Sequence, residues 1–130
     1  MNKKLLEIQQ KIGSIQFGLL RIRNQDDEKT TTLQVKTTAN EDNSLNCVVT
    51  DDAKKDIFIN RNVNLIQKSH NDYLYITGQV ADEVNQKGKI LSIRILKACW
   101  FVRKRKGSVS WLQEKYIYEN LPQEGLDMAS

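Results

Sequence analysis

The sequence contains little proline, glycine, cysteine or histidine, and it has no long hydrophobic run. One Pro and six Gly among 130 residues exclude collagen-like and proline-rich disordered chains. No apolar run approaches the roughly 20 residues that a membrane-spanning helix needs. Polar residues interrupt the first 13 positions, so the continuous apolar segment of a signal peptide is absent. We therefore expect a cytoplasmic protein that has no membrane partner.

Two cysteines and one histidine do not provide the ligand spacing of a metal site. Cys47 and Cys99 lie in apolar, strand-like runs, which predicts two buried thiols rather than nucleophiles. His70 belongs to the polar segment SHND and is expected to be a turn residue. The sequence predicts no metal centre.

The size and composition are those of one globular domain. Of the residues, 39% are hydrophobic and 28% are charged, and 130 residues can form one core of ordinary size but not two. We assign residues 1–121 to a single domain and 122–130 to a C-terminal tail.

The formal charge of +4 is unevenly distributed, because residues 103–106 read RKRK. Such a cluster can contact nucleic acid or an anionic surface, or it can be the solvated tip of a hairpin. The aromatic candidates for base stacking, Tyr73, Tyr75 and Trp100, lie in other segments than this run. The sequence therefore favours the solvated tip over nucleic-acid contact.

Hydrophobic periodicity indicates a mainly β protein. A short amphipathic helix is expected over the first dozen residues, ending at Gly13, and a second helix is expected over 53–60. Strands are expected at 14–23, 30–39, 45–50, 63–69, 72–81 and 89–104. Residues 81–89 read as a polar connection, and 108–121 as a terminal strand or helical turn. Six strands with short connections predict a six-stranded antiparallel β-barrel with two or three short helices.

Alternation along these strands also predicts which side chains share a face. Ile15, Phe17 and Leu19 are expected on one face of the first strand. On the second strand, Leu33, Val35 and Thr37 alternate with Gln34 and Lys36. The long sixth strand is expected to bend or to carry a bulge in order to wrap a barrel.

A candidate phosphate site follows the third strand. Thr50 ends that strand, Asp51 or Asp52 can cap the next helix, and Lys54 and Lys55 stand at the helix start. A hydroxyl, backbone amides and ammonium groups together suit a phosphate. The alternative is that both lysines are merely exposed on a short helix.

The segment from Ile57 to Val63, I-x-x-N-R-N-V, and the later Gly78-x-Val80 resemble the flavin-binding split barrels of the pyridoxamine 5′-phosphate oxidase-like superfamily, most closely the general stress protein 26 type. The resemblance implies a split barrel that binds flavin mononucleotide (FMN) at the interface of a homodimer. It also implies which residues hold the FMN: Gln34, Val35, Lys36, Thr50, Asp51, Lys54 and Lys55.

The chain departs from that family on its second strand, where an Arg-Pro pair is usual and Lys36 is the only cation nearby. The larger C-terminal segment of true pyridoxamine phosphate oxidases is missing, so pyridoxal phosphate synthesis is not expected. No residue stands out as a general base. Two functions remain open: a dimeric flavoprotein that acts as an oxidoreductase on a small molecule, or a non-enzymatic barrel that has lost flavin and binds another anion or nucleic acid.

Overall fold

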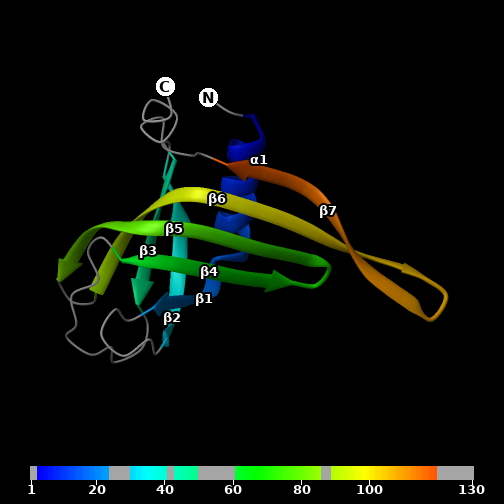
Figure 1. Ribbon diagram of the computed structural model, residues 1–130, viewed down its shortest axis with the longest axis horizontal. Helices are drawn as coiled ribbons and strands as arrows, with labels where there is room; N and C mark the ends of the chain where they lie inside the picture. Colours follow the sequence, from blue (N-terminus) through cyan, green and yellow to red (C-terminus); the bar gives the residue numbers. More distant parts are fainter. Residues whose placement is uncertain (1–2, 24–29, 41–42, 50–60, 86–88, 120–130) are drawn as a thin grey trace, which may run out of the picture.

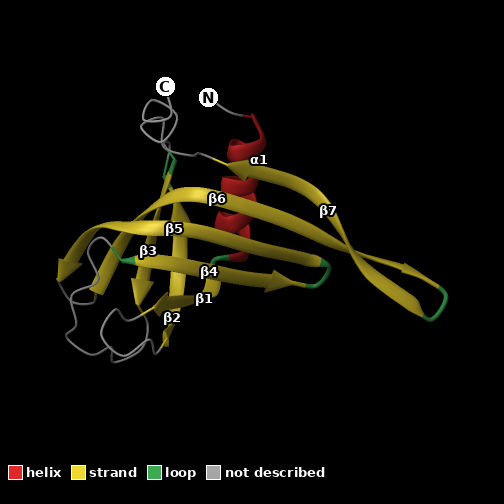
Figure 2. Cartoon of the chain, viewed as in Figure 1, coloured by secondary structure: helices red, strands yellow, loops and turns green. Residues whose placement is uncertain are grey.

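The computed structural model describes residues 3–23, 30–40, 43–49, 61–85 and 89–119. These residues form one helix and seven strands (Figures 1 and 2). Their bounds are α1 Lys3–Ile15, β1 Phe17–Arg23, β2 Thr30–Ala39, β3 Ser44–Val49, β4 Asn62–Ser69, β5 Asp72–Asn85, β6 Lys89–Lys106 and β7 Val109–Glu119.

Six of the strands close into an antiparallel barrel. The hydrogen-bonded order is β3-β2-β1-β4-β5-β6, and a further pairing of β3 with β6 closes the ring (Figure 1). The seventh strand, β7, pairs with the outer part of β6. The prediction of a mainly β, six-stranded antiparallel barrel is thus confirmed.

The 18-residue strand β6 pairs with three other strands, and this requires it to bend. The β5–β6 register shifts between Thr77 and Gly78 and again between Val80 and Asp82. The β6–β7 register shifts between Trp100 and Phe101. Each irregularity adds local bend and twist, so the predicted bending of this long strand is confirmed.

The barrel interior is filled by aliphatic side chains from every strand of the ring, and α1 adds to the same core. On β2 the buried residues are Leu33, Val35 and Thr37, as alternation predicts. On α1, Leu5, Ile8 and Ile12 occur at helical spacing and join the barrel residues in one cluster. The helix therefore covers the interior that the barrel alone would leave open.

A buried polar network fixes the junction between α1 and the barrel. The Gln67 side chain, which is 1% exposed, donates from Nε2 to Thr37 Oγ1 at 2.8 Å and lies 3.3 Å from the Phe17 carbonyl oxygen. Thr37 Oγ1 in turn donates to the Gln16 carbonyl oxygen at 2.9 Å. Gln16 has a φ of 72°, a left-handed conformation typical of the residue that ends a helix. The chain thereby turns sharply from α1 into β1.

Three sequence-based predictions are corrected. The helix continues to Ile15 and does not end at Gly13, so β1 begins at Phe17. Ile15 belongs to α1 and so does not share a strand face with Phe17 and Leu19. Phe17 and Leu19 do share a face, which is the outer one, and Leu20 and Ile22 fill the interior. In the segment FGLLRI, apolar residues occupy both odd-numbered and even-numbered positions, and these point to opposite faces of the strand. Alternation alone therefore does not determine which set is buried.

The third correction concerns residues 81–89, which were expected to be a polar connection. Strand β5 continues through them to Asn85, pairing Asp82 with Ser92 and Glu83 with Leu91. The bulge after Val80 lets the strand bend and continue, with Asp82 exposed. For residues 108–121 the sequence predicts either a strand or a helical turn, and the structure has strand β7 there.

The second predicted helix, 53–60, and the predicted tail, 122–130, lie outside the described residues. In the described part of the chain α1 is the single helix, and with 13 residues it is too short to cross a membrane.

Gly78 lies where β5 and β6 approach closely, and this predicts a steric effect on stability. A Cβ at position 78 would stand 2.5 Å from the Arg94 carbonyl oxygen, whereas a Cβ at Gly13 in α1 would meet nothing within 4 Å. We expect Gly78→Ala to lower the free energy of unfolding by about 1–3 kcal/mol. Gly13→Ala should raise it by about 0.5–1 kcal/mol, because alanine favours the helix. Urea denaturation followed by circular dichroism measures both, and equal effects would contradict the close approach.

Candidate functional site

The predicted FMN residues on β2 divide between the two faces of the strand. Gln34 and Lys36 are exposed on the outer face, whereas Val35 is 1% exposed and packs in the core. The side chain of Val35 therefore cannot contact a ligand. The other predicted residues, Thr50, Asp51, Lys54 and Lys55, lie outside the described residues.

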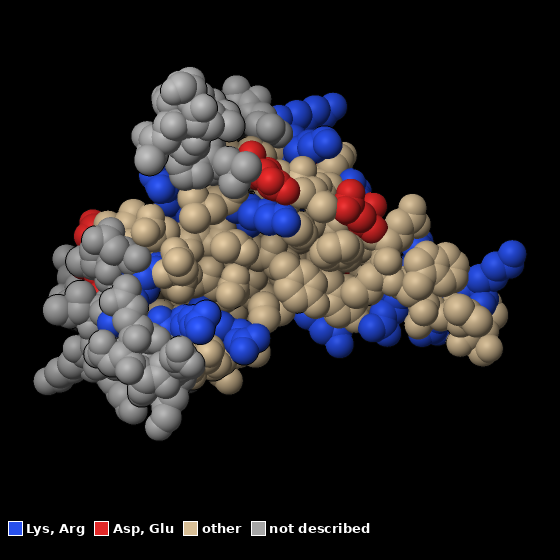
Figure 3. Space-filling view, viewed as in Figure 1, with Lys and Arg blue, Asp and Glu red and all other residues tan. Residues whose placement is uncertain are grey.

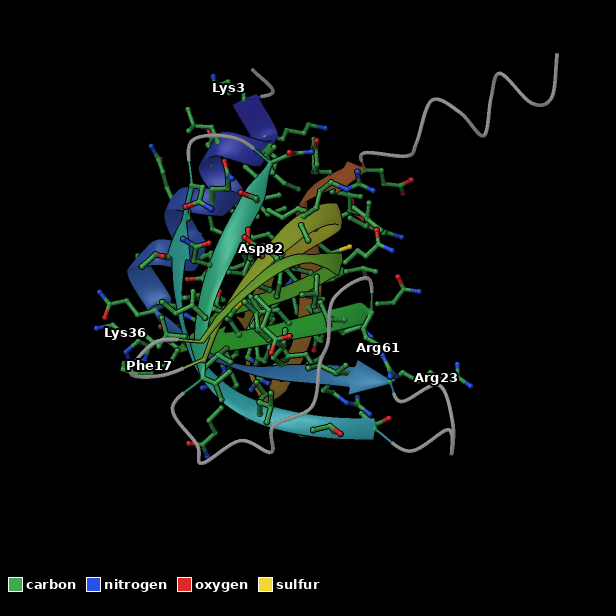
Figure 4. All side chains as sticks on the ribbon, turned by 90° about the vertical axis from the view of Figure 1, so that its left-hand side faces the viewer. Lys3, Phe17, Arg23, Lys36, Arg61 and Asp82 are labelled. Atoms are coloured by element: carbon green, nitrogen blue, oxygen red, sulfur yellow. The ribbon has the colours of Figure 1, made fainter. Side chains whose placement is uncertain are left out.

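The described end of β3 lies beside these β2 residues. Val49 is the register partner of Val35, and Val48 is that of Lys36. Phe17 of β1 pairs with Lys36 on its other side, and the two side chains lie close together in Figure 4. Lys36 thus stands between an exposed aromatic ring and the strand from which the chain continues into Thr50.

An apolar row crosses the outer face of the sheet and begins next to Gln34. Its members are successive cross-strand partners: Leu19, Ile66, Tyr75, Cys99 and Ile117. Leu19 is 43% exposed and Tyr75 is 41% exposed, and Leu19 also pairs with Gln34. We call this set the outer apolar row. In Figure 3 an uncharged area covers the middle of β4, β5 and β6 between charged groups.

Two arginines lie at the other end of β1. Figure 4 shows Arg23 and Arg61 together at the end of the barrel remote from Phe17 and Lys36. Arg61 directly precedes β4, and its buried Nη1 atom has no hydrogen-bond partner among the described residues. Sequence reasoning missed Arg61 as a candidate anion ligand, although it stands inside the I-x-x-N-R-N-V motif where the resembled family tends to have proline.

A polar cluster joins α1 to the barrel around Trp100. Lys11 Nζ lies 2.8 Å from Asp72 Oδ2, and Trp100 Nε1 donates to Asp72 Oδ1 at 2.9 Å. Lys115 Nζ lies 4.1 Å from the centroid of the Trp100 ring, a cation–π distance. A hollow of about 350 Å³ opens here between α1 and Trp100. These contacts tie the helix to the β4–β5 turn and to β7.

Asp72 is held in its charged form within this cluster. Partial burial by itself raises the pKa of Asp72, but hydrogen bonds from Lys11 and Trp100 and the charges of Lys11 and Lys115 outweigh it, so the pKa lies below its ordinary value. A carboxylate that stays ionised and paired is a poor general acid or base at neutral pH. The cluster is therefore suited to fastening the helix and not to proton transfer.

The two cysteine thiols differ in burial. Cys47 is fully buried, and burial raises its pKa to about 12, so it is an inert core residue as predicted. Cys99 is only half-buried and lies on the outer face in the outer apolar row. The prediction of burial is therefore wrong for Cys99, because β6 places the alternate residues Ala98 and Trp100 inward.

The four basic residues of the RKRK run lie on a projecting hairpin. Residues 103–106 of β6 pair with residues 109–112 of β7, and Gly107 stands in the turn with a φ of 62°. We call residues 103–112 the basic arm. Its register sets Trp111 opposite Lys104. Strand β7 thus brings a tryptophan beside the basic run, although Tyr73, Tyr75 and Trp100 lie in other segments.

Among the described residues, no group of three or more His, Cys, Asp or Glu side chains is arranged to hold a metal ion. His70 has a φ of 41° in the tight turn between β4 and β5, as expected for a turn residue.

No protein-family model matches the chain, and no curated protein matches it.

The low pKa of Asp72 predicts how stability depends on pH. A depressed folded-state pKa stabilises the fold above the unfolded-state value of about 3.9, and this contribution is lost as pH falls through the folded-state pKa. Wild type should be more stable than Asp72→Asn at about pH 6, and the difference should shrink below about pH 4. Urea denaturation at several pH values measures it. Asp82→Asn, which changes an exposed side chain, is the control, and a pH-independent difference for Asp72→Asn would contradict the assignment.

Proposed function

We propose that the chain is an FMN-binding barrel of the split-barrel type that acts as a homodimer. The outer apolar row carries this proposal, because it begins beside the two exposed β2 residues, Gln34 and Lys36, on a closed six-stranded barrel. An apolar surface next to a cation and an amide is complementary to a flat ring system with a phosphate tail.

The phosphate end of the site is assigned to Lys36 and Gln34, together with Thr50, Asp51 and one or both of Lys54 and Lys55. An ammonium group, an amide and a hydroxyl are the donors that a phosphate requires. The register partner of Val35 is Val49, and Thr50 follows Val49 in the sequence. Support for one shared site therefore comes from the neighbouring positions of β2 and the end of β3.

The ring of the flavin is assigned to the outer apolar row near β1 and β4. Tyr75 and Phe101 extend the apolar surface there, and their ring centroids are 6.0 Å apart in an edge-on arrangement. When bound, a flavin supplies electron and hydride transfer, and the protein binds and orients it. In this proposal the side chains of the row exclude water from one face of the ring, and no described residue is assigned a proton-transfer step.

The proposed dimer covers the same surface. Phe17 is 59% exposed and Leu19 is 43% exposed, and both lie on the outer face of β1. Contiguous exposed apolar surface of this kind marks an interface. A two-fold dimer buries the same patch on both copies, so each copy would complete the wall of the other's flavin site.

Removing Lys36 should weaken FMN binding, since a charged hydrogen bond to phosphate contributes about 1.5–3 kcal/mol. We expect Lys36→Ala to lower the affinity for FMN by at least about tenfold, measured by quenching of flavin fluorescence. Lys54→Ala combined with Lys55→Ala should have a similar or larger effect. Lys106→Ala, at the tip of the basic arm, is the matched control. Absence of FMN binding by the wild type, or equal losses for Lys36→Ala and Lys106→Ala, would contradict the proposal.

A charge in the outer apolar row should separate the subunits, because burial of a carboxylate at an apolar interface is unfavourable. We expect Leu19→Glu to convert a dimer to a monomer, as measured by size-exclusion chromatography with light scattering. Thr32→Glu places the same charge on exposed β2 outside the row and should leave the dimer intact. A wild-type protein with the mass of a monomer would refute the proposed dimer independently of flavin binding.

A further inference from the structure

The basic arm is a two-stranded ribbon that projects beyond the barrel. Strand β5 begins at Asp72, which pairs with Val102. Arg103 still contacts the barrel, because its backbone N–H donates to the Asn71 carbonyl oxygen at 2.7 Å and its guanidinium lies 5.3 Å from the centroid of the Tyr73 ring. Among the described residues, those of β6 after Arg103 pair only with β7. Figure 1 shows the two strands extending together away from the barrel to a turn. A two-stranded hairpin alone is marginally stable in water. The arm therefore presents both of its faces to the surroundings.

The arm holds the whole excess charge of the protein. It contains four basic and no acidic residues, and the formal charge of the complete chain is +4. The remainder of the chain is thus electrically balanced. Lys and Arg side chains gather on the arm at the right-hand end of Figure 3. Because the positive charge is concentrated on the projecting arm, its electrostatic field attracts a polyanion to the arm.

Alternation divides the charges equally between the two faces of the ribbon. One face carries Lys104, Lys106, Val109 and Trp111, and the other carries Arg103, Arg105, Ser110 and Leu112. The same register places Val109 and Trp111 on the first face and Leu112 on the second.

These apolar side chains have no core to fill. Trp111 is 46% exposed, Leu112 is 44% exposed and Val109 is 61% exposed. The face of Trp111 also has a hollow of about 250 Å³, which is lined by Val102, Lys104, Gln113, Glu114 and Lys115. An exposed tryptophan next to a lysine and a hollow provides a stacking surface together with a phosphate contact.

We propose that the basic arm binds nucleic acid, with cations on both faces contacting phosphates and Trp111 contacting a base or sugar. A two-stranded ribbon fits the major groove of a double helix, which is about 12 Å wide and has a phosphate wall on each side. A single strand supplies the same phosphates and exposes its bases for stacking. The shared ligand chemistry is a phosphate backbone that carries bases.

The distribution of charge favours this ligand over the two alternatives. A membrane surface contacts a ribbon from one side, and the cations of the other face would then remain unused. A second copy of this chain offers no net negative charge outside its own arm. Nucleic acid is the polyanion that can contact both faces of the arm at once.

The test is fluorescence anisotropy of a labelled 20-base-pair duplex and of a labelled single strand of equal length, titrated with the full-length protein at several salt concentrations. We expect binding whose logarithmic affinity falls steeply with the logarithm of salt concentration, with a slope near −0.9 for each phosphate neutralised on a duplex. The comparison of duplex with single strand identifies the form that is bound. Vesicles of anionic lipid are measured in parallel by co-sedimentation.

Paired variants test whether both faces make contact. Arg103→Gln with Arg105→Gln changes one face, and Lys104→Gln with Lys106→Gln changes the other; each pair should reduce the salt slope by about 2 units on a duplex. Lys3→Gln with Lys4→Gln on α1 removes the same charge away from the arm and should leave the slope unchanged. Trp111→Ala should weaken binding more than Trp111→Phe.

The variants concern exposed or half-buried residues, and circular dichroism confirms that each remains folded. Binding to neither nucleic acid, binding to vesicles alone, or an equal loss in the α1 control would overturn the proposal. A loss in only one of the two arm pairs would overturn the two-faced contact.

Discussion

The pairing of β3 with β6 is the constraint on which the rest of the structure depends. It joins the first three strands to the last long one, with Leu45 opposite Ile93 and Cys47 opposite Leu91. Without this pairing the six strands would be an open sheet with two exposed edges. Closure separates an inside from an outside and so decides which member of each alternating pair is buried. The helix α1 then covers the core, and the Gln67 amide holds its end in place.

Closure also determines the character of the outer surface. Among the described residues, the inward-facing side chains of the six strands form one packed cluster, and the ligand site that we propose lies on the outer face. Three of the residues that alternation directs outward on β1, β4 and β5 are apolar, namely Leu19, Ile66 and Tyr75. This surplus of apolar surface is the physical basis for proposing a flavin and a dimer partner at one location.

Strand β6 connects the two proposed surfaces. Its first half closes the barrel, its middle contributes Cys99 to the outer apolar row, and its last residues form one side of the basic arm. The bulge after Trp100 changes the register where the strand leaves the barrel. The row and the arm differ in chemistry because residues 103–106 are all basic, although β6 joins the two in one strand. The two proposals can therefore be tested with variants that do not overlap.

The sequence by itself determined the class of fold, the N-terminal helix and the approximate places of the six barrel strands, because alternation and helical spacing are local properties of the chain. It also identified Leu33, Val35 and Thr37 as one face of β2 and marked residues 103–106 as an unusual cluster. Only the tertiary structure decided that Phe17 and Leu19 face outward, that β5 continues to Asn85, and that Trp111 stands opposite Lys104. These features depend on register and closure between strands distant in sequence, and periodicity within one strand is the same for either register.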